Sequence, residues 1–148
     1  MDVKNAFVET AMGVLSEFGF SSVFAEKNET GGLVEAEYVN VVMGVNGAIS
    51  GNLIMTAKKE SALAIASAML GGMEFTEVDD MVKSAIGELL NIIAGNAFSK
   101  VDVKAAVYIS TPTLLIGEGI SVLLQSPGTN KLVFDMDGQS MDVFLDIE

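Results

Sequence analysis

Residues 76–101 read TEVDDMVKSAIGELLNIIAGNAFSKV, and this stretch decides the fold. Its apolar residues recur at the spacing of one helical face: Val78, Val82, Ala85, Leu89 and Ile93. This periodicity predicts a long amphipathic helix that ends near Val101. Thr76 is followed three residues later by Asp79, an acidic variant of a capping box, which predicts the helix start.

The opposite stripe of this helix holds polar residues and glycines: Glu77, Asp80, Ser84, Gly87, Glu88, Asn91 and Gly95. Ser84, Glu88 and Asn91 are spaced i, i+4 and i+7, so their side chains line one ridge. A glycine inside a helix costs about 1 kcal/mol relative to alanine. Two glycines beside a carboxylate and a carboxamide therefore indicate close approach by another surface. The alternative is an ordinary solvated helix face, where Glu and Asn are common.

The rest of the chain alternates helical and strand-like patterns. We expect one helix over residues 5–18 and a second that is capped by Thr56 and ends at Gly71-Gly72. Strand patterns occupy residues 33–38, 40–45, 49–56, 105–110, 120–125, 132–136 and 141–147. This order predicts an α+β fold, with an antiparallel or mixed sheet and long helices packed on one face. We expect a single domain over residues 1–148, as the length allows.

Composition removes several classes of function. The 148 residues carry a net charge of −12 and contain no cysteine and no histidine. Thiol nucleophiles, Ser-His-Asp triads, disulfides and the usual zinc ligands are therefore excluded. A strongly acidic chain is a poor partner for nucleic acid or for an anionic membrane surface.

The uncharged stretch 38–57 is long enough to span a membrane, but Asn46-Gly47 within it predicts a hairpin instead. Residues 1–4 lack the apolar core of a secretory signal. The sequence thus predicts a soluble, cytoplasmic protein.

A weak internal repeat divides the chain into two helix-plus-strands halves. Residues 10–15 align with residues 84–89 at an offset of 74. In this alignment, Val14 and Glu17 occupy the places of Glu88 and Asn91. The first half therefore lacks the carboxylate–amide pair.

The pattern Ser84-x-x-x-Glu88-x-x-Asn91, continued by residues 92–97 (IIAGNA), resembles the signature of the CheC/CheX chemotaxis phosphatases. The resemblance is closest to the CheX type and extends to residues 5–7 and to the glycines of the hairpin, Gly47 and Gly51. CheX-type proteins keep the pair in the second half only, which implies one active site per chain.

The resemblance implies hydrolysis of the aspartyl phosphate on a CheY-like response regulator. In that role Asn91 would position the attacking water, and Glu88 would pair with the regulator's active-site lysine. Ser84, Gly87 and Gly95 would contact the partner. The chain would bind no cofactor or metal of its own, because the regulator supplies Mg²⁺.

The resemblance also implies a homodimer that pairs through sheet edges. Residues 40–45 and 120–125 contain no charge, so either segment would be unprotected at an edge.

Two other readings remain open. One is a non-catalytic binding module like the middle domains of flagellar switch proteins, which lack the Glu/Asn pair. The other is a dimeric scaffold whose acidic ridge binds a basic partner. Three methionines near helix ends, Met69, Met73 and Met81, fit either a core or an adaptable binding surface.

Overall fold

The computed structural model describes residues 1–29 and 31–148. The helices are α1 (Val3–Glu17), α2 (Lys59–Met69) and α3 (Asp80–Ser99). The strands are β1 (Ser22–Glu29), β2 (Gly32–Glu35), β3 (Val39–Gly47), β4 (Gly51–Ala57), β5 (Val107–Ile109), β6 (Thr113–Ile116), β7 (Ser121–Leu124), β8 (Thr129–Met136) and β9 (Gln139–Ile147).

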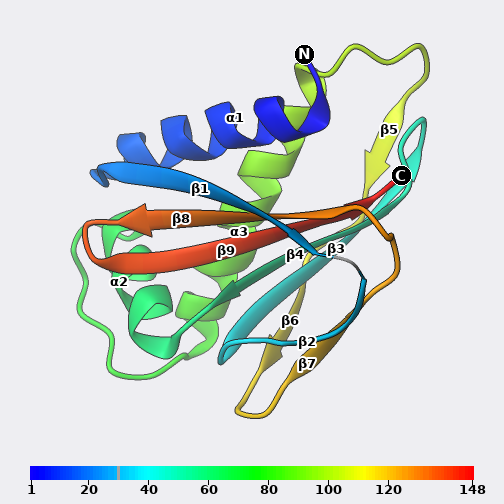
Figure 1. Ribbon diagram of the computed structural model, residues 1–148. Helices are drawn as coiled ribbons and strands as arrows, with labels where there is room; N and C mark the ends of the chain where they lie inside the picture. The colour runs from blue at the N-terminus through cyan, green and yellow to red at the C-terminus, as the bar shows by residue number, and fades with distance from the viewer. Residues whose placement is uncertain (30) are drawn as a thin grey trace.

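The fold has three layers, and Figure 1 shows α3 behind the strands of the main sheet. In the described residues, the main sheet runs β1-β8-β9-β4-β3, and β5 and β6 both pair with the outer side of β3. All of its pairings are antiparallel. The helices cover one face, and a ribbon of β2 and β7 lies against the other. The predicted α+β class, with an antiparallel sheet and helices on one face, is confirmed.

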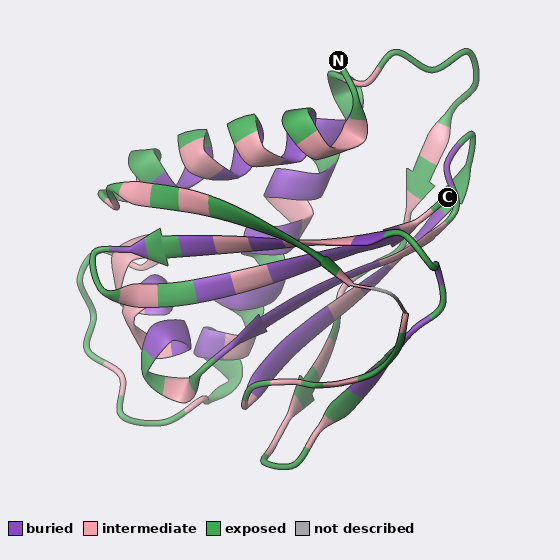
Figure 2. Cartoon of the chain, viewed as in Figure 1, coloured by how far each residue is buried: buried purple, intermediate pink, exposed green. Residues whose placement is uncertain are grey.

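Strand alternation explains why the sheet has a core on each face. In β4, Leu53 and Met55 pack under the helices, whereas Ile54 between them packs under the ribbon. Successive side chains of a strand point to opposite faces, so a central strand covered on both sides must be apolar throughout. Figure 2 shows buried colour along most of β4.

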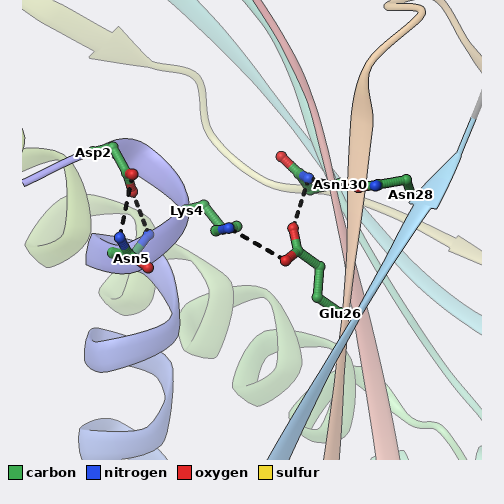
Figure 3. A network of polar contacts seen from close by, with 6 residues as sticks. All are labelled: Asp2, Lys4, Asn5, Glu26, Asn28 and Asn130. Atoms are coloured by element: carbon green, nitrogen blue, oxygen red, sulfur yellow. Dashed lines mark hydrogen bonds and ion pairs between the residues drawn. The ribbon is translucent and has the colours of Figure 1, made fainter.

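Polar contacts fix the start of α1 (Figure 3). The Asp2 carboxylate caps the helix by accepting from the backbone N–H of Asn5 at 2.7 Å. Lys4 pairs with Glu26 of β1 at 3.2 Å, and Glu26 also accepts from the Asn130 amide of β8 at 2.8 Å. These contacts tie the helix to the edge of the sheet.

A buried carboxylate holds the loop that joins β7 to β8. Asp146 of β9 is 2% exposed and accepts from the backbone N–H groups of Gln125 (2.9 Å) and Ser126 (2.7 Å) and from the Thr129 hydroxyl (3.0 Å). Burial alone would raise the pKa of Asp146, but these hydrogen bonds outweigh it and lower the pKa below its ordinary value.

The predicted duplication is visible in the topology. The first half runs α1, β1, β2, β3, β4, and the second runs α3, β5 and β6, β7, β8, β9. The last strands of the halves, β4 and β9, pair at the centre of the sheet, and β2 pairs with β7 in the ribbon. Each half therefore contributes an equivalent set of strands around a pseudo-two-fold axis.

Two predicted helix caps are wrong. Thr56 is a buried residue of β4, and its hydroxyl accepts from the backbone N–H of Glu37 at 2.7 Å. Helix α2 begins two residues later, after Lys58. Thr76 likewise precedes α3 without capping it, because Asp79 is the N-cap and accepts from Val82 N–H at 2.9 Å.

Strand prediction missed β1 and β6 and misplaced one turn. The β3–β4 hairpin forms, but Asn46 and Gly47 belong to β3 and pair with Tyr108 and Val107 of β5. The turn comes after them. Tertiary pairing with a strand 60 residues away therefore overrides the local Asn-Gly turn preference.

One of the two segments expected at a sheet edge is interior. Residues 40–45 lie in β3, which is paired on both sides. Residues 120–125 include β7, whose pairing among the described residues is with β2 alone. The uncharged edge is therefore on the ribbon.

Candidate functional site on helix α3

Helix α3 is held rigidly, which fixes the direction of its exposed ridge. Ten of its residues are buried: Val82, Ala85, Ile86, Gly87, Leu89, Leu90, Ile93, Ala94, Ala97 and Phe98. Phe98 meets Phe7 of α1 edge to face, with ring centroids 6.3 Å apart. A helix locked by packing on this scale presents its outward side chains without a cost in backbone ordering entropy at binding.

The ridge holds three of the predicted site residues together. Ser84 and Glu88 are exposed and Asn91 is half-buried, at the predicted helical spacing. In the described part of the chain, the side-chain hydrogen bonds at α3 involve its cap Asp79 and its last residue Ser99, and none involves the ridge. The carboxylate and the carboxamide are therefore available to a partner.

The two ridge glycines have different environments, and one prediction is corrected. Gly87 is buried, and a Cβ added there would lie 3.3 Å from both Leu114 Cδ2 and Pro112 Cγ. The surface that approaches Gly87 is thus this chain's own β6 region, and Gly87 is not a partner contact. Gly95 is exposed, with nothing within 4 Å of an added Cβ.

Two hollows flank the ridge. One, of about 270 Å³, is lined by Ser84 and Glu88 together with apolar residues, namely Met69, Leu70, Met81 and Ala85. The other, of about 370 Å³, lies toward the end of α3 and includes Gly95 and Phe98. The structure therefore brings Ser84 and Glu88 to one hollow and places Gly95 at a second, with Asn91 between them in sequence.

Sequence reasoning did not find the apolar wall beside Glu88. Its members come from the end of α2 and the start of α3, and the two helices meet only in the folded chain. The methionines near the helix ends were the sequence feature that could have indicated this apolar wall. The contact of Pro112 and Leu114 with Gly87 left no local trace in the sequence.

The surroundings of the ridge are acidic. Asp79 and Asp80 lie at the start of α3, and Glu77 just before it pairs with Lys59 at 2.9 Å.

Among the described residues, no three carboxylates gather as a metal site would require. In that same part of the chain, no helix combines the length and hydropathy that crossing a bilayer demands.

The fold and the ridge define an α+β protein that presents a carboxylate and a carboxamide, one helical turn apart, on a rigid helix. The profile of the family described as chemotaxis phosphatase CheX matches residues 39–136. The chain belongs to this family.

Named relatives agree with this assignment. The CheY-P phosphatase CheX of Thermotoga maritima is 40% identical over 82 residues, which is 55% of this chain and 53% of that protein. The match thus spans about half the length of that relative.

Two crystal structures share the fold. Chemotaxis protein CheX from Desulfovibrio desulfuricans superposes with a TM-score of 0.83 at 22% identity, covering 100% of this chain and 99% of the other. A CheX–CheY–BeF₃–Mg²⁺ complex from Borrelia burgdorferi gives a TM-score of 0.83 at 24% identity, with the same coverage.

Proposed function

We propose that this protein accelerates hydrolysis of the aspartyl phosphate on a CheY-like response regulator. The observation that carries the proposal is the Glu88–Asn91 pair on the outward ridge of α3, free of intramolecular partners in the described residues. Membership of the CheX family and the name of the Thermotoga relative support it.

The chemistry needs positioning more than it needs a strong base. Water attacks phosphorus as the bond from phosphorus to the aspartyl oxygen breaks, which releases inorganic phosphate and the free carboxylate. The oxygen and both protons of the water leave with the phosphate. An acyl phosphate is already reactive, so catalysis depends on in-line placement of the water and on electrostatics. The neutral Asn91 amide can hydrogen-bond the water without adding negative charge beside the phosphoryl group.

Glu88 serves to dock the partner. It lies three residues before Asn91 and is exposed, so it can pair with a lysine beside the regulator's phosphorylation site. Ser84, one further turn away, extends that contact. When bound, Mg²⁺ neutralises phosphoryl charge, and we assign it to the regulator, since this chain offers no carboxylate cluster in its described residues.

We further propose a cytoplasmic homodimer that binds neither nucleic acid nor membrane. The net charge of −12 disfavours polyanionic partners. The uncharged outer edge of β7 supports pairing between two copies. The β1 edge carries Glu26, Lys27 and Glu29, which protect it from edge-to-edge pairing.

The alternative, a non-catalytic module like a flagellar switch middle domain, is less well supported. Such a module has no need of the carboxylate–amide pair, and in the described residues neither Glu88 nor Asn91 makes an internal side-chain hydrogen bond that would give it a structural role.

The test is the decay of a phosphorylated CheY-type receiver domain with and without this protein. Wild type should accelerate the decay. Asn91→Ala should lose roughly a hundredfold of the acceleration while still binding, because the amide acts mainly in the transition state. Glu88→Ala should weaken binding and lower activity together.

Asn96→Ala is the matched control, an exposed asparagine of the same helix that lies off the ridge. It should behave as wild type. Full activity in Asn91→Ala, or equal loss in Asn96→Ala, would refute the assignment of roles.

A further inference from the structure

The hollow beside Glu88 has an unusual composition for an exposed surface. Met69 and Leu70 from the end of α2 and Met81 and Ala85 from α3 form its apolar wall, and Ser84 and Glu88 complete it. Met81 is 47% exposed although it is a large apolar side chain. Contiguous apolar surface rimmed by polar groups is typical of an interaction site.

The hollow continues the ridge. Met81, Ser84 and Glu88 are spaced i, i+3 and i+7 on α3, so they follow one another along the same side of the helix that carries Asn91. A partner that reaches Asn91 and Glu88 therefore covers the hollow as well.

The charges around the hollow restrict what can occupy it. Glu88 lines it, and Asp79 and Asp80 lie beside Met81 at the helix start. An acidic rim favours a partner whose apolar side chain stands next to a basic one. A lysine beside an apolar residue would pair with the acidic rim while its neighbour fills the apolar hollow.

We propose that the docked receiver domain of the phosphorylated regulator inserts an apolar side chain into this hollow, next to the lysine that pairs with Glu88. This inference rests on the proposed function and adds a specificity-determining contact to it. Methionine suits the task, because its flexible, polarizable side chain adapts to the shape of a partner.

The apolar contact is separate from the catalytic step, since Met81 lies ten residues before Asn91. It contributes to binding in the ground state and in the transition state alike, so its loss should raise KM and leave kcat nearly constant.

The test varies Met81 and uses Met73 as its matched control. Met73 is 48% exposed and lies in the α2–α3 connection, but it does not line the hollow. Met81→Gln keeps the length of the side chain and removes its apolar end, whereas Met81→Leu keeps the apolarity. We measure initial rates of dephosphorylation over a concentration series of phosphorylated receiver domain.

Met81→Gln should raise KM about fivefold, which corresponds to about 1 kcal/mol, the burial of roughly half a large apolar side chain. Met81→Leu should restore KM to within about twofold, and Met73→Gln should match wild type. Binding of the beryllofluoride-activated receiver domain, followed by fluorescence anisotropy, should weaken by the same factor in Met81→Gln.

The two proposals fail in different ways. If wild type accelerates dephosphorylation but Met81→Gln keeps its KM, or if Met73→Gln loses as much, the hollow is not a docking contact and the proposed function stands. If wild type neither accelerates decay nor binds the activated receiver domain, the proposed function fails, and the inference fails with it.

Discussion

Replacing Gly95 with alanine should make the protein more stable and less active. Gly95 lies inside α3, is exposed, and has no neighbouring heavy atom within 4 Å of an added Cβ. The methyl group therefore meets no clash, and the helix gains about 1 kcal/mol from the loss of unfolded-state freedom. For a domain of this size, that gain raises Tm by about 2–4 °C.

The activity should fall because the same methyl group stands one turn beyond Asn91 on the ridge. Inserting a methyl group into a tightly packed contact typically costs about 1–3 kcal/mol. If the partner approaches the helix backbone at Gly95, kcat/KM should drop about tenfold. Gly87→Ala should behave differently, because its Cβ would lie 3.3 Å from Pro112 Cγ and Leu114 Cδ2, and that crowding offsets the helical gain.

The assay combines thermal unfolding with the dephosphorylation rate. Gly13→Ala is the control, since Gly13 is an exposed glycine inside α1 with nothing within 4 Å of an added Cβ. It should gain the same stability and keep full activity. A Gly95→Ala variant with a raised Tm and wild-type kcat/KM would refute close approach at Gly95. A Gly95→Ala variant whose Tm does not rise would contradict the open space around the added Cβ.

The remaining predictions concern the buried carboxylate, the metal and the assembly. Asp146→Asn should destabilise the protein by about 1–3 kcal/mol at neutral pH, because three hydrogen bonds to the carboxylate are weakened. The folded pKa of Asp146 is depressed, so the stability that its carboxylate contributes is present above the unfolded pKa of about 3.9 and is lost as pH falls through the folded pKa. A stability difference between wild type and Asp146→Asn that stayed constant in urea titrations down to pH 2 would contradict this. Calorimetry should detect no micromolar Mg²⁺ binding to the isolated chain, whereas dephosphorylation should require Mg²⁺; a tight site on this chain would overturn the assignment of the metal to the regulator. Light scattering at micromolar concentration should give about twice the chain mass of 15.5 kDa, and a mass near 15.5 kDa would exclude a stable homodimer.

The features that the sequence predicted well are those with local causes. Helix α3 carries its apolar period and its ridge within twenty consecutive residues. Between the strand patterns of residues 132–136 and 141–147, the β8–β9 hairpin turns at Asp137-Gly138, where both residues have positive φ (56° and 90°). This geometry is what an Asp-Gly pair favours in a two-residue loop.

The features that the sequence did not predict depend on distant partners. Strand β1 is mostly exposed and mixes charges with apolar residues, so no clean alternation marks it. It is a strand because residues 22–29 pair with residues 129–136 of β8. The burial of Gly87 has the same origin, since Pro112 and Leu114 reach it from beyond the end of α3. Neither contact can be inferred from a local window.

The internal repeat was found, but its alignment is shifted by one residue. At the predicted offset of 74, buried Val14 falls on exposed Glu88, which two helices with equivalent packing cannot share. At an offset of 75, Val14 falls on buried Leu89, and buried Leu15 falls on buried Leu90. The offset of 74 matches identical small residues, whereas the offset of 75 matches the buried face of one helix to the buried face of the other.

The corrected alignment gives a physical reason for a single site in each chain. Exposed Gly13 falls on Glu88 and exposed Ser16 falls on Asn91, so α1 lacks the carboxylate–carboxamide pair at the equivalent positions, although exposed Glu9 falls on Ser84. Val14 and Glu17, which fall on Glu88 and Asn91 at the offset of 74, do not occupy the equivalent positions. Because Val14 packs in the core, a carboxylate there would be buried, whereas Gly13 and Ser16 have lost the pair at positions that remain open to a partner. The two halves thus keep a common packing phase, and they differ at the outward positions that hold the Glu88–Asn91 pair in α3.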